Sequence, residues 1–195
     1  MSGRNEPGKR MEGAARRAQL LATAREIVQH CGVAALTLAN LATACGVSKP
    51  IAYNHFGTRE RLLAELYQEL GAEHDASARA ALARLQADGG TRSAAARTIA
   101  AALIDCLVQN GPLYDAIMAA LLASPDGARL ADELTEAIVA AYAATLAELG
   151  EGPERARALV RAMIGASEGL VAALARHEVE RDEAIALLAR LIAPD

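Results

Sequence analysis

Residues 36–63 read LTLANLATACGVSKPIAYNHFGTRERLL, and this stretch decides the fold of the 195-residue chain. Thr37 is the predicted N-cap of a short helix that ends before Gly46. Ser48 is the predicted N-cap of a second short helix, in which Pro50 is tolerated because the first turn has no intrahelical partner for its N–H. Two short helices joined by a tight, glycine-containing turn are typical of a helix-turn-helix.

Apolar residues at helical spacing, separated by Gly and Pro breaks, predict helices along the rest of the chain. A first helix ends at Gly32, and Thr58 caps a long helix that runs to about Gln86. After Gly89 and Gly90, the breaks predict five more helices, over 92–109, 112–123, 126–149, 153–177 and 181–193. Ala and Leu dominate, and no stretch alternates as a strand does. The sequence therefore predicts an all-α fold of about nine helices.

Charge is distributed unevenly along the chain. Residues 1–61 hold nine Lys/Arg and four Asp/Glu, a net charge of +5, whereas the remainder holds eleven and twenty, a net charge of -9. A basic head on an acidic body favours a head that binds a polyanion such as nucleic acid. The alternative is a solvated face with a modest positive excess.

The second short helix is a candidate reading helix. Its N-terminus presents free N–H groups and a partial positive charge to phosphate. Polar and contact-forming side chains crowd onto about two turns, namely Lys49, Ile51, Tyr53, Asn54 and His55. From the pattern alone, an ordinary helical corner with polar residues facing solvent explains them equally well.

Residues 45–56, CGVSKPIAYNHF, followed by RERLL at 59–63, resemble the DNA-binding domain of the TetR (tetracycline repressor) family. Order, spacing and residue type agree over about residues 14–66. The resemblance implies a flexible basic arm over 1–13, a helix-turn-helix domain over 14–58, and a ligand-binding and dimerisation domain over 59–195.

The resemblance also implies individual roles at the DNA. Pro50 and Ile51 would face base edges, where Ile51 could touch a thymine methyl, and Lys49 would reach bases or backbone. Ser48 would cap the reading helix, and Asn54 is a further expected DNA-binding residue. Phosphate contacts are implied for Thr37, Tyr53, His55 and Arg59. Many family members have Arg at the position of Ala39 and Gly-Thr at Pro50–Ile51, so the operator sequence is not predicted.

The basic arm has two interpretations. Its cationic side chains, together with two that follow it, are Arg4, Lys9, Arg10, Arg16 and Arg17. They either reach a minor groove or phosphates, or belong to a basic tail with no specific role.

An apolar stripe in the last two predicted helices suggests packing between two chains or within one. Its members are Leu159, Met163, Ala166, Leu170, Leu174, Ile185, Leu188 and Ile192. The family resemblance favours the first interpretation, a homodimer built from these helices.

The resemblance further implies a small-molecule effector, whose identity the sequence does not give. Polar or polarisable side chains on apolar helical faces are candidate effector contacts, each of which plain core packing also explains. They are Tyr67, His74, Cys106, Tyr114, Met118, Tyr142 and Met163.

No enzyme, metal centre, cofactor or membrane span is predicted. Residues 165–169 satisfy the G-x-S-x-G pattern of hydrolases, but that motif requires a preceding strand, and here it falls within a predicted helix. Cys31, Cys45 and Cys106 lack metal-ligand spacing, and their odd number favours no disulfide framework. The resulting hypothesis is a cytoplasmic bacterial repressor that an effector releases from double-stranded, pseudo-palindromic operator DNA. The alternatives are an activator, a DNA-binding protein without an effector, and an enzyme or carrier.

Overall fold

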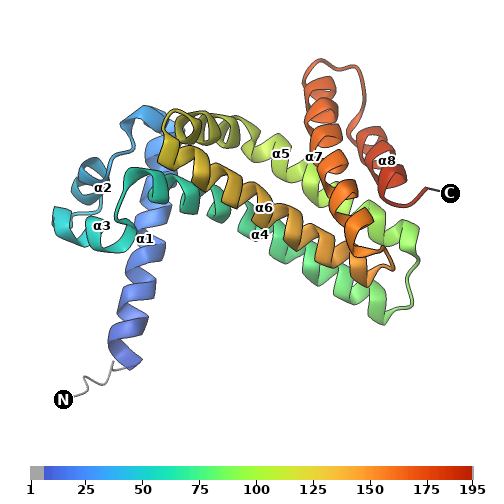
Figure 1. Ribbon diagram of the computed structural model, residues 1–195, viewed down its shortest axis with the longest axis horizontal. Helices are drawn as coiled ribbons and strands as arrows, with labels where there is room; N and C mark the ends of the chain where they lie inside the picture. Colours follow the sequence, from blue (N-terminus) through green and yellow to red (C-terminus); the bar gives the residue numbers. More distant parts are fainter. Residues whose placement is uncertain (1–6, 195) are drawn as a thin grey trace. The chain divides into compact units, whose positions relative to one another are not determined.

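The computed structural model describes residues 7–194, and in that range every regular element is a helix and no strand is present (Figure 1). This confirms the predicted all-α class. The elements are α1 (Pro7–Cys31), the short 3₁₀ helix η1 (Val33–Ala35), α2 (Leu38–Ala44), α3 (Lys49–Phe56), α4 (Arg59–Ala87), α5 (Arg92–Leu122), α6 (Pro125–Glu148), α7 (Pro153–Ala175) and α8 (Arg181–Ile192).

The prediction of two helices over 92–109 and 112–123 is wrong. One helix, α5, runs through Pro112 without a break, so the described residues form eight α-helices rather than nine. A proline inside a helix costs about 3 kcal/mol because it removes one backbone hydrogen bond and crowds the preceding turn. Burial on both sides of the proline offsets this cost, since Ile104 and Ile117 are both fully buried.

The chain divides into two compact units. The head unit contains the chain up to Glu69 together with Pro112–Ala131, and the body unit contains Leu70–Gly111 and the chain from Asp132 onward. The functional domain boundary expected after residue 58 stays a prediction. Helices α4, α5 and α6 each continue from one unit into the other, and α5 does so at Pro112.

The head unit is built around α1, α2, α3 and the first turns of α4. Its largest fully buried side chains on and between these elements are Leu20, Leu36, Leu41, Leu62, Leu63 and Leu66. Phe56, at the end of α3, is 2 % exposed and closes this core. Fully burying each such side chain contributes about 1.5–3 kcal/mol, so the core fixes the position of the two short helices.

Part of the expected basic arm is helical. Helix α1 begins at Pro7, so residues 7–13 form its first turns. Arg16 and Arg17 lie further along the same helix. Arg4 and the rest of residues 1–6 lie outside the described residues.

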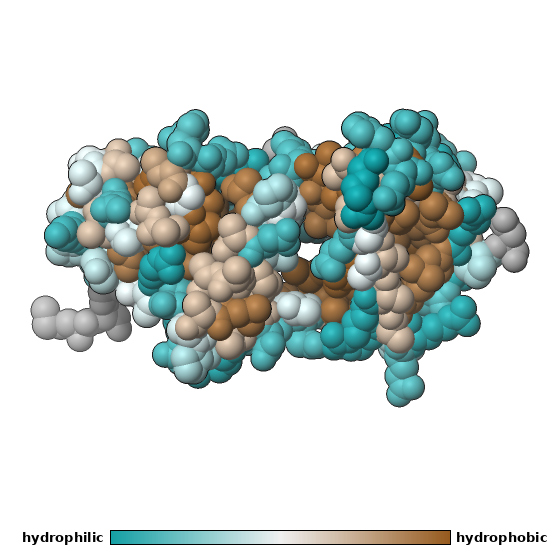
Figure 2. All heavy atoms as spheres, turned by 90° about the horizontal axis from the view of Figure 1, so that it is seen from above, coloured by the Kyte–Doolittle hydropathy of each residue, from teal (hydrophilic) through white to brown (hydrophobic). Residues whose placement is uncertain are grey.

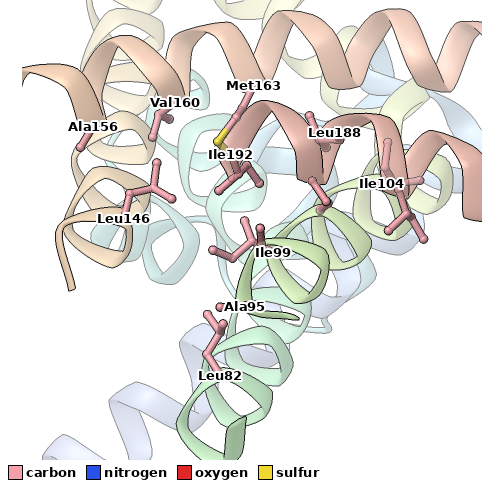
Figure 3. Packing of buried hydrophobic residues seen from close by; sticks show 14 of the residues in the cluster. Leu82, Ala95, Ile99, Ile104, Leu146, Ala156, Val160, Met163, Leu188 and Ile192 are labelled. Atoms are coloured by element: carbon pink, nitrogen blue, oxygen red, sulfur yellow. The ribbon is translucent and has the colours of Figure 1, made fainter. Parts of the chain in front are cut away.

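The body unit has its own core, to which α4, α5, α6, α7 and α8 contribute (Figure 3). Met163 of α7 and Ile192 of α8 are each 1 % exposed and point into this core. Ile185 and Leu188 are buried there as well. These four residues were expected at a dimer interface, but α7 and α8 pack on each other within the chain and cover them.

Candidate nucleic-acid interface

The turn between α2 and α3 is a helix C-cap of the Schellman type. The N–H of Gly46 donates to the carbonyl of Thr43 at 3.1 Å, and the N–H of Val47 donates to the carbonyl of Ala42 at 2.9 Å. Gly46 has a φ of 65°, in the left-handed region that side chains disfavour. A glycine at this position therefore allows the chain to turn sharply from α2 into α3.

The two expected N-caps behave differently. The Thr37 hydroxyl accepts a hydrogen bond of 3.1 Å from the N–H of Asn40, which confirms it as the cap of α2. Ser48 occupies the N-cap position of α3 with extended backbone, but its hydroxyl makes no capping bond. The side chain of Ser48 is exposed at the helix N-terminus, a position suited to contact with a phosphate group.

Helix α3 has a buried face and an exposed face. Ala52 and Phe56 are buried in the head core. The exposed face carries most of the residues expected at DNA, namely Ser48, Lys49, Pro50, Ile51, Tyr53 and Asn54, and His55 is half-buried. Ile51 and Tyr53 are 37 % and 50 % exposed, which places them among the few large exposed apolar side chains of the described residues. This face combines a cation, hydroxyl groups and apolar contacts on two turns.

Arg17 joins three helices of the head. Its guanidinium donates a hydrogen bond of 2.7 Å to the backbone carbonyl of His55 and pairs with the carboxylate of Glu65 on α4. The guanidinium carbon also lies 5.0 Å from the centre of the Phe56 ring, within cation–π range. Arg17 therefore holds the C-terminal end of α3 against α4. Sequence reasoning missed this role because the partner carbonyl has no sequence signature.

Arg59 also has internal partners. Its Nε donates to the carbonyl of Leu36 at 2.7 Å, and Nη2 donates to the carbonyl of Val33 at 2.8 Å. These bonds tie the start of α4 to η1 and to Leu36, the residue that follows η1. A phosphate contact by Arg59 stays a prediction, and it would rest on Nη1.

The candidate effector residues belong to both units, and their contact with an effector stays a prediction. In the head unit, the rings of Tyr67 and Tyr114 pack with centroids 4.6 Å apart. In the body unit, His74 bonds Gln109 at 2.8 Å, and Met163 is buried in the core. Met118 belongs to the head unit and Cys106 to the body unit.

Tyr142 is the only one of these candidates that lines the body cavity, a space of about 50 Å³ between α4, α5 and α6. Its hydroxyl donates a hydrogen bond of 3.1 Å to Oδ1 of Asp75. Burial raises the pKa of the Tyr142 hydroxyl well above its ordinary value, and the neighbouring Asp75 carboxylate raises it further. The hydroxyl therefore stays protonated and acts as a donor at neutral pH.

The G-x-S-x-G pattern lies inside α7, and its serine is part of the body packing. Ser167 is fully buried, and its hydroxyl donates to the carbonyl of Ile164 at 2.8 Å. A nucleophile elbow instead presents an exposed serine between a strand and a helix. Among the described residues, no group of three His, Cys, Asp or Glu side chains is placed to hold a metal ion.

Helix α7 exposes a face of small residues, which we call the small-residue face. It consists of Ala158, Ala162, Gly165, Gly169 and Ala172, spaced alternately four and three residues apart. An 18-residue window of α7 has a mean hydropathy of 1.5, yet only 17 % of it is buried. By length and composition α7 could cross a membrane, but one such helix is weak evidence. Figure 2 shows that hydrophobic residues, coloured brown, also lie at the surface elsewhere on the molecule.

Comparison with known families gives one match. The model of the bacterial regulatory proteins of the tetR family matches residues 20–66, which contain the C-terminal half of α1, all of α2 and α3, and the start of α4. No curated protein sequence matches the chain significantly.

Several solved structures share the fold over nearly the whole chain. The multidrug binding protein EbrR, solved in complex with imidazole, is 24 % identical over 92 % of this chain and 96 % of its own, with a TM-score of 0.63. A putative TetR-family transcriptional regulator from Rhodococcus sp. is 19 % identical over 92 % and 97 %, with a TM-score of 0.67. The Thermus thermophilus repressor FadR, solved with lauroyl-CoA, is 21 % identical over 90 % and 92 %, with a TM-score of 0.63.

Proposed function

We propose that this protein, a DNA-binding regulator whose N-terminal domain is that of the tetR family of bacterial regulatory proteins, is a cytoplasmic repressor that a small molecule releases from its operator. One observation carries the proposal. Residues 20–66, which match the family, form the compact core of the head. On its helix α3, Lys49, Ile51 and Tyr53 are exposed on one face.

Helix α3 would lie in the major groove. Ile51 and Pro50 would contact base edges, while Lys49, Tyr53 and His55 would bind phosphates or bases near the ends of the helix. Thr37 and Ser48, at the N-termini of α2 and α3, would add phosphate contacts. Phosphate contacts would fix the register, and the short apolar surface of Ile51 would supply sequence preference.

A second copy of the chain would cover the small-residue face of α7. A Cβ added at Gly165 or Gly169 would meet nothing within 4 Å in the same chain, so packing inside one chain does not require these glycines. Each glycine in a helix interior costs about 1 kcal/mol relative to alanine. Close approach of a partner helix would explain them, and Leu187 and Leu191 of α8 are also exposed.

The effector would act through α4. This helix carries Arg59 and Glu65, which hold the DNA-binding helices, and it continues into the body, where Asp75, Arg79 and Leu82 line the cavity. A ligand that favours one position of α4 would thereby favour one position of α3. The FadR and EbrR structures were solved with small molecules bound, which supports a ligand-responsive body.

Two experiments test the proposal. Selection of bound duplexes from a random DNA pool should yield a pseudo-palindrome with half-sites about 10 bp apart, one turn of the double helix. Deletion of the gene should raise transcription from the promoter that contains this sequence. Lowered transcription would indicate an activator, and recovery of no sequence would contradict DNA recognition by α3.

A further inference from the structure

The cavity of the body unit has an acidic side chain that lacks a cationic partner. Asp75 lies on α4 and is half-buried at the cavity wall. Tyr142 bonds only its Oδ1, and none of the ion pairs among the described residues includes Asp75. A partly buried carboxylate is stabilised strongly by a charged donor, because such hydrogen bonds are about twice as strong as neutral ones.

Apart from Arg79, the remaining walls of the cavity are apolar or already bonded. Leu82 and Ile99 are buried, and Ala78, Ala102 and Ala141 complete the lining together with Arg79 and Thr145. The Thr145 hydroxyl donates to the carbonyl of Ala141 on its own helix. The ring of Tyr142 adds a π-face that favours a nearby cation.

Arg79 is the one cationic side chain of the lining, and an anionic ligand would have to use it. Its side chain is exposed, whereas Asp75 and Tyr142 are half-buried. An anion bound at Arg79 would also face the Asp75 carboxylate. Residues 62–195 carry a net charge of -9, and this field attracts cations and repels anions.

We propose that this cavity binds the ammonium group of a small amphipathic amine, with Asp75 as its counter-ion. Tyr142 holds the carboxylate through Oδ1 and leaves Oδ2 to accept from the ammonium group. A space of about 50 Å³ admits one functional group, so the charged end enters and the apolar part lies along Leu82 and Ile99 toward the opening. The role of this amine as the effector rests on the proposed function.

The test compares three ligands of equal length on the full chain, namely octylammonium, 1-octanol and octanoate, by isothermal titration calorimetry at pH 7. An alkylammonium group is protonated there, because such amines have a pKa of about 10.4, as lysine does. Octylammonium should bind the wild-type protein at least about tenfold more tightly than either other ligand. Equal or tighter binding of octanoate, or no binding of octylammonium at millimolar concentration, overturns the inference.

Variants locate the site. Asp75→Asn should weaken octylammonium binding by roughly tenfold, and Tyr142→Phe by roughly threefold, because the ring remains. Arg79→Gln is the matched control on the same cavity, and it should leave binding unchanged or slightly tighter. Unchanged affinity in a folded Asp75→Asn protein overturns the inference, as does a loss confined to Arg79→Gln.

A separate DNA measurement distinguishes this inference from the proposed function. Fluorescence anisotropy of the selected operator should fall when octylammonium is added to wild-type protein and should stay high with Asp75→Asn. Asp75-dependent binding without release supports the amine site and contradicts its effector role. Release by another compound, without any amine binding, supports the proposed function and overturns the amine site.

Discussion

The guanidinium of Arg17 lies 2.7 Å from the backbone carbonyl of His55, so the N-terminal helix holds the last turn of α3. The same guanidinium pairs with Glu65, which belongs to α4. Any shift of α4 therefore acts on the end of α3 through one side chain. This arrangement gives Arg17 a positioning role, in contrast to the direct DNA contact considered from the sequence.

Replacing Arg17 with alanine should weaken DNA binding on every sequence to a similar extent. The change removes the bond to His55 and the pair with Glu65, and we expect a loss of about 1–2 kcal/mol in the stability of the head. The salt dependence of binding should stay unchanged, because no phosphate contact is lost. Arg16→Ala is the control, since Arg16 bonds Gln19 on the same helix and no partner on another helix among the described residues. If the slope of log binding constant against log salt concentration fell by about one ion per subunit, Arg17 would instead contact phosphate.

Arg59→Gln should act mainly on folding. Two carbonyls, of Leu36 and Val33, lose a charged donor, and a bond of this kind contributes about 1.5–3 kcal/mol when buried, less here because the side chain is half-buried. Thermal unfolding of the full chain measures this loss. The salt slope of DNA binding should change less than in Lys49→Ala. An unchanged melting temperature with a slope lower by one ion would restore Arg59 to a purely phosphate-binding role.

Substitution of Lys49 should change the affinity for DNA, whereas substitution of Ile51 should change the sequence specificity. Lys49→Ala removes an exposed cation at the start of α3, and the salt slope should fall by about one ion per subunit if it meets phosphate. Ile51→Ala should change the preferred bases, with a cost of roughly 1–3 kcal/mol on the wild-type operator only. Selection from the random DNA pool, repeated with each variant, measures the preferred bases. Equal loss on all sequences after Ile51→Ala would mean that Ile51 reads no base.

Sequence patterns predicted the head better than the body, and the reason is physical. The caps and breaks around α2 and α3 are local, so Thr37, Gly46 and Ser48 suffice to place these helices. Pro112 predicted a break that burial on both sides of the proline overrides. Local sequence patterns do not reveal packing between residues that are far apart in the chain.

The same limit applies to individual side chains of the body and head. A stripe that contains Met163 and Leu188 looks alike whether it packs within a chain or between two, and only the structure shows that these two side chains are buried within one chain. The partners of Arg17 and Arg59 are backbone carbonyls, to which any residue type contributes equally. Sequence therefore indicated that these arginines are cationic but not what they bind.

Operator DNA and effector should weaken each other's binding by the same factor. Reversing occupancy from nearly full to nearly empty needs about 10⁴-fold preference, or 5.5 kcal/mol, for the released state. Two cavities per dimer would each supply about 2–3 kcal/mol, within the usual range of allosteric coupling. Titration of octylammonium with and without saturating operator measures the factor directly. Identical affinities in the two titrations would contradict allosteric release by this ligand.

The last prediction concerns the small-residue face of α7. Helices that cross with glycine and alanine at the contact approach to about 8 Å between axes, the short end of the normal range. A leucine at Gly169 would hold two such helices apart, while within the chain its side chain would extend into open space. Gly169→Leu should therefore leave the monomer folded and even raise its intrinsic helix stability by roughly 1 kcal/mol. Sedimentation at micromolar concentration should show a shift from dimer toward monomer.

The matched control is Gly13→Leu, because Gly13 is also a glycine within a helix with nothing near an added Cβ, but it lies in α1. This variant should remain dimeric. Loss of the dimer in Gly169→Leu should also abolish tight binding to the palindrome, since one half-site supplies only part of the binding energy, and only a dimer holds two copies of α3 about 34–36 Å apart. If Gly169→Leu stays dimeric with full operator affinity, the dimer uses another surface, and exposed Leu187 and Leu191 of α8 become the next positions to change.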